Sequence, residues 1–191
     1  MRFLFLVLAS ACTPHLTSER EEVTGLNWEP PENTWTSNEP PATLRAEGYA
    51  QGDVPHDFRM MDQHGDEVSL WQFYGSVILL DISTMWCGPC QQIARHVDET
   101  WKDYREQGFV YLTVLPEDTE KNLVDTDDLN EWADAFGINA PILADHEGYG
   151  YAVEPTQQWP VLMLIDRKMT IAADRLTPSD EAVRDAIESE L

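Results

Sequence analysis

The chain has 191 residues, of which 42% are hydrophobic, and its 35 acidic and 12 basic residues give a net charge of −23. This length suits one buried domain with a tail, and the charge argues against a nucleic-acid partner, because phosphate binding needs a basic face. The acidity also repels anionic lipid headgroups, so any membrane attachment must come from something other than surface charge.

The N-terminus has the order of an export signal. Arg2 is followed by an apolar run from Phe3 to Leu8 and then by small residues. The run is roughly half of the ~20 residues that a membrane-spanning helix needs, so the segment is not predicted to span a membrane. We therefore expect residues 1–11 to be a signal peptide.

The residues Ala9-Ser10-Ala11-Cys12 resemble the lipobox of bacterial lipoproteins, in which the cysteine carries the lipid and begins the mature chain. The resemblance implies export to the periplasm and a membrane anchor at Cys12. A short secretory signal cut by ordinary signal peptidase is the alternative. Thr13 stands where an acidic residue often retains lipoproteins at the inner membrane, which leaves the outer membrane open as the location.

Residues 12–48 have the composition of a flexible tether. They are rich in Pro, Glu, Asn, Ser and Thr, with two Pro-Pro pairs and almost no aliphatic clustering. Trp28 and Trp35 are the exceptions; they could dock on the domain or on a partner, although isolated aromatic residues in a linker are more often incidental. The folded domain is expected to occupy residues 49–191.

Strands and helices alternate through the expected domain. The run 76–83 is almost continuously apolar, which is typical of a central strand buried on both faces. The expected strands cover residues 57–62, 67–70, 76–83, 109–115, 140–144, 161–166 and 169–173, and the expected helices cover residues 90–107, 127–136 and 178–190. This order predicts an α/β domain with a central mixed sheet flanked by helices.

Cys87 and Cys90 are the candidate reactive pair, because they alone remain if Cys12 carries lipid. They close too small a loop to staple a fold, so a structural disulfide explains them poorly. Cys87 is expected at a helix N-terminus, where unpaired N–H groups and the helix dipole stabilise a thiolate, the attacking species. Cys90, one turn further, should be more buried and should resolve the mixed disulfide.

The motif Trp86-Cys87-Gly88-Pro89-Cys90 resembles the active-site signature of thioredoxins, and the wider pattern is closer to the exported TlpA/ResA-like branch of that superfamily. The branch is indicated by Val54-Pro55-His56-Asp57-Phe58, by Val68-Ser69-Leu70 and by the extra segment of about residues 116–151 before the last hairpin. The resemblance implies a thioredoxin fold with an N-terminal hairpin extension. It also implies a thiol–disulfide oxidoreductase that acts on exported proteins through Cys87 and Cys90.

Further site residues are implied by the same resemblance. Pro160 matches the cis-proline that faces the cysteine pair in thioredoxin folds, where the adjacent backbone pairs with the substrate; an ordinary trans proline is the alternative. Trp159 precedes it, where a small or β-branched residue is more usual. Together with Trp86, Gly88 and Pro89, Trp159 is expected to line the substrate site.

Asp81 lies six residues before Cys87, which is the spacing of the buried acid of thioredoxin. A carboxyl at the end of an apolar strand should have a raised pKa, because burial disfavours its charged form. Asp81 would then be placed to take the proton of Cys90 during resolution. A hydrogen-bonded structural aspartate at the strand end is the alternative.

Three other chemistries compete for the cysteine pair. A zinc site lacks a second cysteine pair or a nearby His pair to complete four ligands. A copper metallochaperone of related fold usually separates its cysteines by three residues, and here two lie between them. A peroxidase of the peroxiredoxin type has Pro-x-x-x-Thr/Ser-x-x-Cys; Thr84 fits this pattern, but Leu80 stands where the proline is required.

The residues between the cysteines indicate the direction of exchange. Gly-Pro is the choice typical of reductants, which favours a reductase that a membrane electron donor must recharge, although the redox state of the compartment can reverse the direction. The expected partners are therefore exported protein thiols or disulfides and that donor. No cofactor and no metal is predicted.

Overall fold

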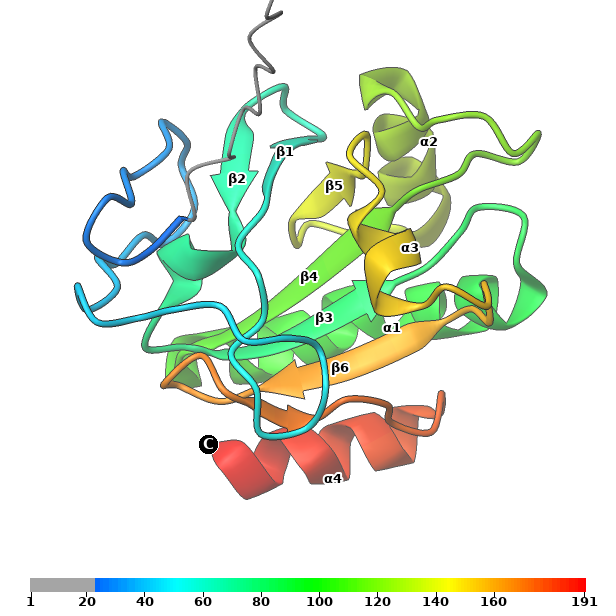
Figure 1. The fold of residues 1–191 in the computed structure, drawn as a ribbon. Coiled ribbons are helices and arrows are strands. Elements are labelled where there is room, and N and C mark those ends of the chain that lie inside the picture. Colours follow the sequence, from blue (N-terminus) through cyan, green and yellow to red (C-terminus); the bar gives the residue numbers. More distant parts are fainter. Residues whose placement is uncertain (1–22) are drawn as a thin grey trace, which may run out of the picture.

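The computed structural model of the protein describes residues 23–191, so the expected signal peptide and Cys12 lie outside the described residues. The strands are β1 (Arg59–Asp62), β2 (Glu67–Ser69), β3 (Val77–Ile82), β4 (Phe109–Leu115), β5 (Ile142–Ala144), β6 (Val161–Ile165) and β7 (Ile171–Ala173) (Figure 1). The helices are α1 (Gly88–Tyr104), α2 (Thr126–Phe136), α3 (Tyr149–Val153) and α4 (Asp180–Glu190), with short 3-10 helices η1 (Leu70–Phe73) and η2 (Arg105–Gln107). Among these helices of residues 23–191, none is long and apolar enough to cross a membrane.

The seven strands form one mixed sheet in the order β2-β1-β5-β4-β3-β6-β7. Strands β3, β4 and β5 are parallel, while β6, β7 and the β1–β2 hairpin run antiparallel to their neighbours. Every residue of β3 and β4 is buried, as predicted for apolar strands at the centre of a sheet. The N-terminal hairpin and the segment between β4 and β6 complete the predicted thioredoxin fold.

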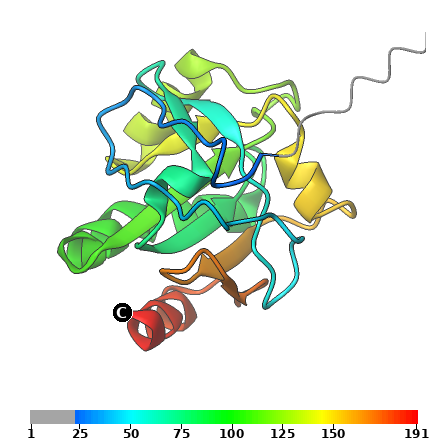
Figure 2. The ribbon, with the colours of Figure 1, turned by 60° about the vertical axis from the view of Figure 1, so that its left-hand side comes forward.

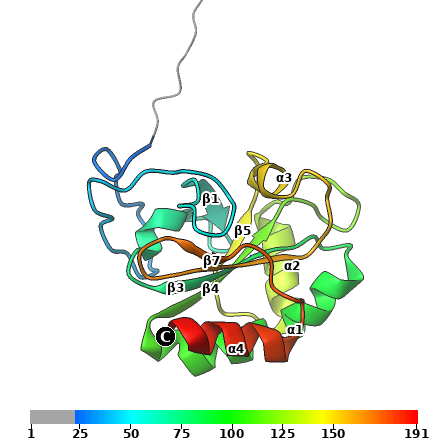
Figure 3. The ribbon, with the colours of Figure 1, turned by 60° about the horizontal axis from the view of Figure 1, so that its bottom comes forward.

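Two hydrophobic cores lie on the two faces of the sheet. Successive side chains of a strand point to opposite faces, so Leu79 packs in the core with α1, α2 and α4, whereas Leu80 packs in the other core. Figures 1 and 3 show α1 and α4 together on one face. The second core is completed by η1, by Tyr149 of α3 and by the chain before β1.

Capping residues set the helix boundaries. The Asp125 carboxylate accepts a hydrogen bond from the backbone N–H of Asp128 and begins α2, and the Ser179 hydroxyl accepts one from Ala182 and begins α4. Gly137 ends α2 with a φ of 68°, in the left-handed region that favours glycine. The predicted helices at these places are confirmed to within two residues.

Residues 23–48, here called the N-terminal strap, are packed on the domain instead of forming the expected flexible tether. Figure 2 shows the strap, in blue and cyan, lying across the β1–β2 hairpin. Trp28 is only 7% exposed, and its Nε1 donates to the Ser69 hydroxyl at 2.9 Å. Trp35 Nε1 donates to the Asp62 carboxylate at 2.6 Å. The packed part of the described chain therefore includes residues before 49.

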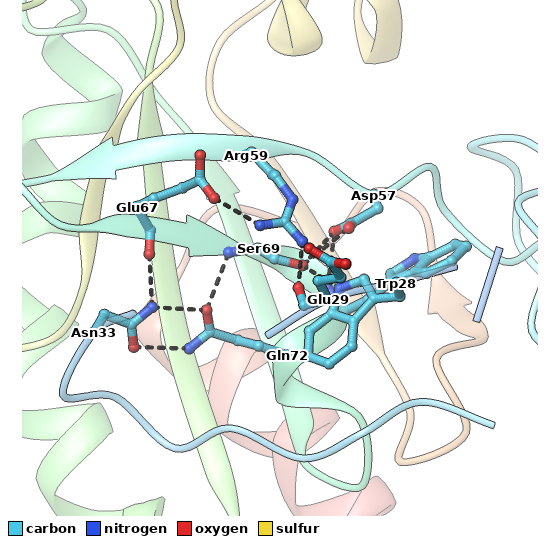
Figure 4. A network of polar contacts seen from close by, with 9 residues as sticks. Trp28, Glu29, Asn33, Asp57, Arg59, Glu67, Ser69 and Gln72 are labelled. Carbon is cyan, nitrogen blue, oxygen red and sulfur yellow. Dashed lines mark hydrogen bonds and ion pairs between the residues drawn. The ribbon is translucent and has the colours of Figure 1, made fainter. Parts of the chain in front are cut away.

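Polar side chains, not regular secondary structure, fasten the strap (Figure 4). Asn33 Nδ2 donates to the Glu67 carbonyl at 2.7 Å and to Gln72 Oε1 at 3.0 Å, and Gln72 Nε2 donates back to Asn33 Oδ1 at 3.2 Å. Gln72 Oε1 also accepts the backbone N–H of Ser69 at 3.0 Å. The composition of the strap did not predict that it docks on the domain. Low aliphatic content argues against an apolar face, but it does not exclude single aromatic residues that are anchored by polar partners.

Helix α3 was not predicted from the sequence. Its five residues are too few to show an apolar period, and a buried acid outside the helix holds its start. The Asp145 carboxylate accepts the backbone N–H groups of Tyr149 at 2.9 Å and Gly150 at 2.7 Å. These hydrogen bonds satisfy donors that a helix N-terminus leaves unpaired, which explains why so short a helix forms.

Candidate active site

The site begins where β3 ends. The chain from Ser83 to Cys87 crosses to α1 and is pinned to the end of β4 by backbone hydrogen bonds. Ser83 N donates to the Val114 carbonyl at 3.0 Å, and Met85 N donates to the Glu117 carbonyl at 3.0 Å. The cysteine loop is therefore anchored on the central parallel strands, a rigid support for a reactive group.

Cys87 and Cys90 are joined in a disulfide with their Cα atoms 5.2 Å apart. Cys87 is the N-cap residue of α1, and its Sγ accepts the backbone N–H of Cys90 at 3.2 Å. Pro89 lies in the first turn, where a missing N–H costs no helical hydrogen bond. When the disulfide is open, the N–H groups at this helix N-terminus are expected to favour the Cys87 thiolate.

The two cysteines differ in their access to solvent. Cys90 is completely buried, whereas Cys87 is 5% exposed between the exposed residues Trp86 and Gly88. A Cβ built on Gly88 would meet no atom within 4 Å, so the space beside Cys87 is open. Both cysteines are thus buried, but Cys87 keeps some exposure beside two exposed residues, whereas Cys90 keeps none.

Pro160 lies at the same edge of the sheet. The Trp159–Pro160 peptide bond is cis, and β6 follows immediately, with Val161 in register opposite Ile82 of β3. Because Ile82 is the last residue of β3, this pairing brings the proline to the point where the chain leaves for the cysteines. Pro160 and the segment that leads to the cysteines thus start from neighbouring ends of β6 and β3.

Trp159 is accommodated by α3. Its ring packs edge-on against Tyr151, with the ring centroids 6.0 Å apart, and it contributes to the core below. Its Nε1 is buried without a hydrogen-bond partner among the described residues. A large aromatic residue before Pro160 is therefore compatible with the site, because Tyr151 provides a surface for its ring.

An ion pair fixes the loop that precedes Trp159. Arg175 pairs with the Glu154 carboxylate, and its Nη1 donates to the Gln158 carbonyl at 3.4 Å. The same carboxylate accepts the backbone N–H of Thr156 at 2.9 Å. The hydrogen bonds from Thr156 and the charge of Arg175 hold the pKa of Glu154 below its usual value, so the pair stays ionised at neutral pH.

Asp81 lies inside the sheet on the face that α1 covers. It is 2% exposed, and its neighbours in register are Thr113 on β4 and Leu162 on β6. The Ser83 hydroxyl donates to Asp81 Oδ1 at 2.6 Å, and the Tyr111 hydroxyl donates to Oδ2 at 3.4 Å. Burial raises the pKa of Asp81 to about 7, against the opposing effect of these hydrogen bonds.

Three residues beside Trp86 escaped the sequence analysis. Glu117 accepts a hydrogen bond from Trp86 Nε1 at 2.6 Å and another from the Tyr151 hydroxyl at 2.6 Å, and Lys121 Nζ lies 4.3 Å from the centroid of the Trp86 ring. Burial and the bond to Glu117 raise the pKa of Tyr151 to about 12. Glu117 and Lys121 lie in the loop after β4 and Tyr151 lies in α3, so their only signal in the sequence was the insertion after β4.

The family profile of AhpC/TSA proteins matches residues 51–174 of the chain. The thiol-disulfide oxidoreductase ResA of Geobacillus thermodenitrificans is 28% identical over 121 residues, which cover 62% of this chain and 64% of that protein. The chain thus spans just under two thirds of the length of this relative. The thioredoxin-like protein YneN of Bacillus subtilis is 26% identical over 126 residues, 65% of this chain and 70% of that protein.

Solved structures share the fold. The thioredoxin domain of a thiol-disulfide oxidoreductase from Bacteroides vulgatus aligns with a TM-score of 0.63 and 18% identity, covering 73% of this chain and 96% of that one. At this identity the likeness concerns the arrangement of strands and helices. It agrees with the mixed sheet and the helix placement described above.

Proposed function

Because the chain belongs to the AhpC/TSA family and carries a cysteine pair at the head of α1, we propose that it is a thiol–disulfide oxidoreductase. The observation that carries the proposal is the placement of the pair, with Cys87 at the N-cap of α1 beside exposed residues and Cys90 fully buried in the first turn of the helix. One sulfur can meet a substrate, and the other can meet only the first sulfur. That asymmetry is what a two-step exchange requires.

The reaction proceeds through a mixed disulfide. The Cys87 thiolate attacks one sulfur of a substrate disulfide, a new S–S bond forms, and the other substrate sulfur leaves as a thiolate that takes a proton from water. Cys90 then loses its proton and attacks the Cys87 sulfur, which closes the Cys87–Cys90 disulfide and releases the second substrate thiolate. Two electrons pass to the substrate, and the chain ends in the disulfide form.

Asp81 is the proposed acceptor of the Cys90 proton. It lies on the face of the sheet that α1 covers, and a pKa of about 7 suits a group that must take and return a proton near neutral pH. Tyr111 and Ser83 hold the carboxylate in place through its two oxygens. This support keeps Asp81 in a single orientation.

The proposed direction is reduction of disulfides in exported proteins. Gly88 and Pro89 between the cysteines are typical of reductants, and a membrane electron donor would return the Cys87–Cys90 disulfide to the dithiol. A matched relative is named a thiol-disulfide oxidoreductase, which supports thiol–disulfide exchange as the reaction. The location proposed is the periplasm, with the chain anchored through a lipid on Cys12. Replacing Cys12 with serine should move the protein from the membrane fraction to the soluble fraction; unchanged fractionation would contradict the anchor.

Insulin reduction, with dithiothreitol as the electron source, tests the activity. The wild-type protein should accelerate precipitation of the insulin chains, and Cys87→Ser should abolish the acceleration. Cys90→Ser, reduced beforehand and mixed with insulin after dithiothreitol is removed, should accumulate a covalent complex that added dithiothreitol releases. Activity retained by Cys87→Ser would reject the proposal. Consumption of hydrogen peroxide at a rate above that of insulin reduction would instead support a peroxidase.

A further inference from the structure

A single carboxylate links Trp86 to α3. Glu117 stands just after β4, and its two oxygens accept one hydrogen bond each, from the Trp86 indole at 2.6 Å and from the Tyr151 hydroxyl at 2.6 Å. Tyr151 in turn packs against Trp159, the residue before the cis peptide bond. The residue preceding Cys87 and the residue preceding Pro160 are thereby connected through Glu117.

The same segment holds Trp86 at a second point. The Lys121 ammonium lies 4.3 Å from the centroid of the Trp86 ring, within the distance at which a cation is attracted to an aromatic face. Glu117 therefore binds the edge of the indole while Lys121 covers one face. Trp86 nevertheless remains 37% exposed, so part of its surface is free beside the reactive sulfur.

The backbone at Lys121 adopts a conformation that a lysine does not favour. Its φ is 67°, in the left-handed region where glycine is the usual residue. The Asp118 carboxylate shapes this turn by accepting the backbone N–H groups of Glu120 at 2.7 Å and Asn122 at 2.8 Å. A strained residue points to a role that offsets its cost, and the contact that Lys121 makes here is with Trp86.

We propose that Glu117 and Lys121 are positioning residues that hold Trp86 as a docking surface for the polypeptide flanking the attacked disulfide. This inference rests on the proposed function. A free indole would sample several rotamers, and ordering it when substrate binds would weaken binding. Held from its edge and one face, the indole presents its remaining surface next to Cys87 before the substrate arrives. The loop of residues 117–122 then contributes to recognition of polypeptides without touching the sulfur.

The test compares a polypeptide with a small disulfide. Insulin reduction should fall roughly tenfold in kcat/KM, mainly through KM, in Glu117→Ala, because a charge-assisted hydrogen bond of ordinary strength is lost. Reduction of oxidised glutathione, which is too small to cover Trp86, should change less than twofold. Glu117→Gln keeps the size and one acceptor oxygen and should recover part of the insulin activity.

Lys121→Gly separates positioning from stability. Glycine suits the φ of 67°, so the midpoint of urea unfolding should stay the same or rise while kcat/KM for insulin falls severalfold. Lys168→Gly, in the exposed turn between β6 and β7, is the matched control and should leave insulin reduction unchanged. A structural role alone would make activity follow the urea midpoint, and that result would overturn the proposal.

A second measurement does not depend on catalysis. The indole N–H signal of Trp86 in a nitrogen-15 spectrum, assigned through Trp86→Phe, should move upfield and exchange faster with water in Glu117→Ala. Unchanged insulin kinetics in both Glu117→Ala and Lys121→Gly, with an active wild type, would reject only the docking surface. An inactive wild type would reject the oxidoreductase itself, and with it the substrate that this inference requires.

Discussion

The hydroxyl of Ser83 donates a hydrogen bond of 2.6 Å to Asp81 Oδ1, at the end of the strand that leads to the cysteines. Hydrogen bonds of this kind favour the charged carboxylate, yet burial dominates and raises the pKa of Asp81 to about 7. Asp81 therefore changes its charge in the pH range in which thiols exchange. Its protonation should be visible both in turnover and in stability.

Asp81→Asn should remove a pH dependence from turnover. In the wild type the carboxylate is ionised above pH about 7 and accepts the Cys90 proton, so insulin reduction should rise through that pH. In the variant the rise should disappear, and the rate at pH 8 should fall by up to roughly 100-fold, the lower range for lost general base catalysis. Stopped-flow measurement from pH 5 to pH 9 checks this, and a matching profile in the variant would leave Asp81 with a structural role.

The stability effect of Asp81 has the opposite direction to that of a salt-bridged acid. Its pKa is raised from 3.8 when unfolded to about 7 when folded, so the folded state binds more protons between these values. The contribution of Asp81 to stability is therefore greatest below pH about 4, declines as the pH rises to 7, and is constant above it. Asp81→Asn should raise the free energy of unfolding at pH 8 by on the order of a few kcal/mol and by little at pH 4.

Urea unfolding of both proteins at pH 4, 6 and 8 measures this difference. Asp57 supplies a second, weaker slope that the variant retains, because burial raises its pKa to about 6. The free energy of unfolding therefore varies with pH in both proteins, and the gain from Asp81→Asn is the difference between them at each pH. This difference should grow from pH 4 to pH 7. An equal gain at all three pH values would show that the substitution acts through packing.

Much of the central sheet could be predicted from the sequence, because β3 and β4 are continuous apolar runs and little else buries such a run. The cysteine motif could be located for a similar reason, since its residues are adjacent in the chain. The contacts around Glu117 could not, because Trp86, Glu117 and Tyr151 come from three segments that only the folded sheet edge brings together. The local sequence pattern does not indicate which distant segments come into contact.

Docking of the N-terminal strap could not be predicted from the sequence for a different reason. Its aromatic residues are isolated in a polar, proline-rich segment, and a tether is the usual outcome of that composition. The order comes from partners far away in sequence, such as Ser69 for Trp28 and Asp62 for Trp35. Composition describes a segment alone, whereas docking depends on the surface that receives it.

The strap should contribute to the stability of the whole domain. Trp28→Ala should lower the free energy of unfolding by about 3–5 kcal/mol, as expected for removing a buried large aromatic side chain. Trp28→Phe keeps most of the packing and loses the hydrogen bond to Ser69, so it should cost about 1 kcal/mol. Leu26→Ala is the control, because Leu26 is 76% exposed and should change stability by less than about 0.5 kcal/mol.

Urea unfolding followed by circular dichroism measures these three variants. The insulin activity of Trp28→Phe should remain that of the wild type, since Trp28 bonds to Ser69 at the end of β2, in a different element from the cysteine loop. Equal stability of Trp28→Ala and Leu26→Ala would mean that the strap is not docked in solution.

A substitution at Gly88 should lower activity without lowering stability. A Cβ at this position would meet no atom within 4 Å, and the residue lies in the first turn of α1, so Gly88→Ala should be tolerated or stabilise by up to about 1 kcal/mol. Insulin reduction should nevertheless fall, because the methyl group occupies the space through which a chain approaches Cys87.

Gly137→Ala is the matched control: its φ of 68° makes the substitution cost about 1–2 kcal/mol, while the distant site keeps its activity. The two variants should therefore show opposite orders of stability and activity, and a Gly88→Ala protein with unchanged kcat/KM for insulin would mean that the substrate chain does not pass over this residue.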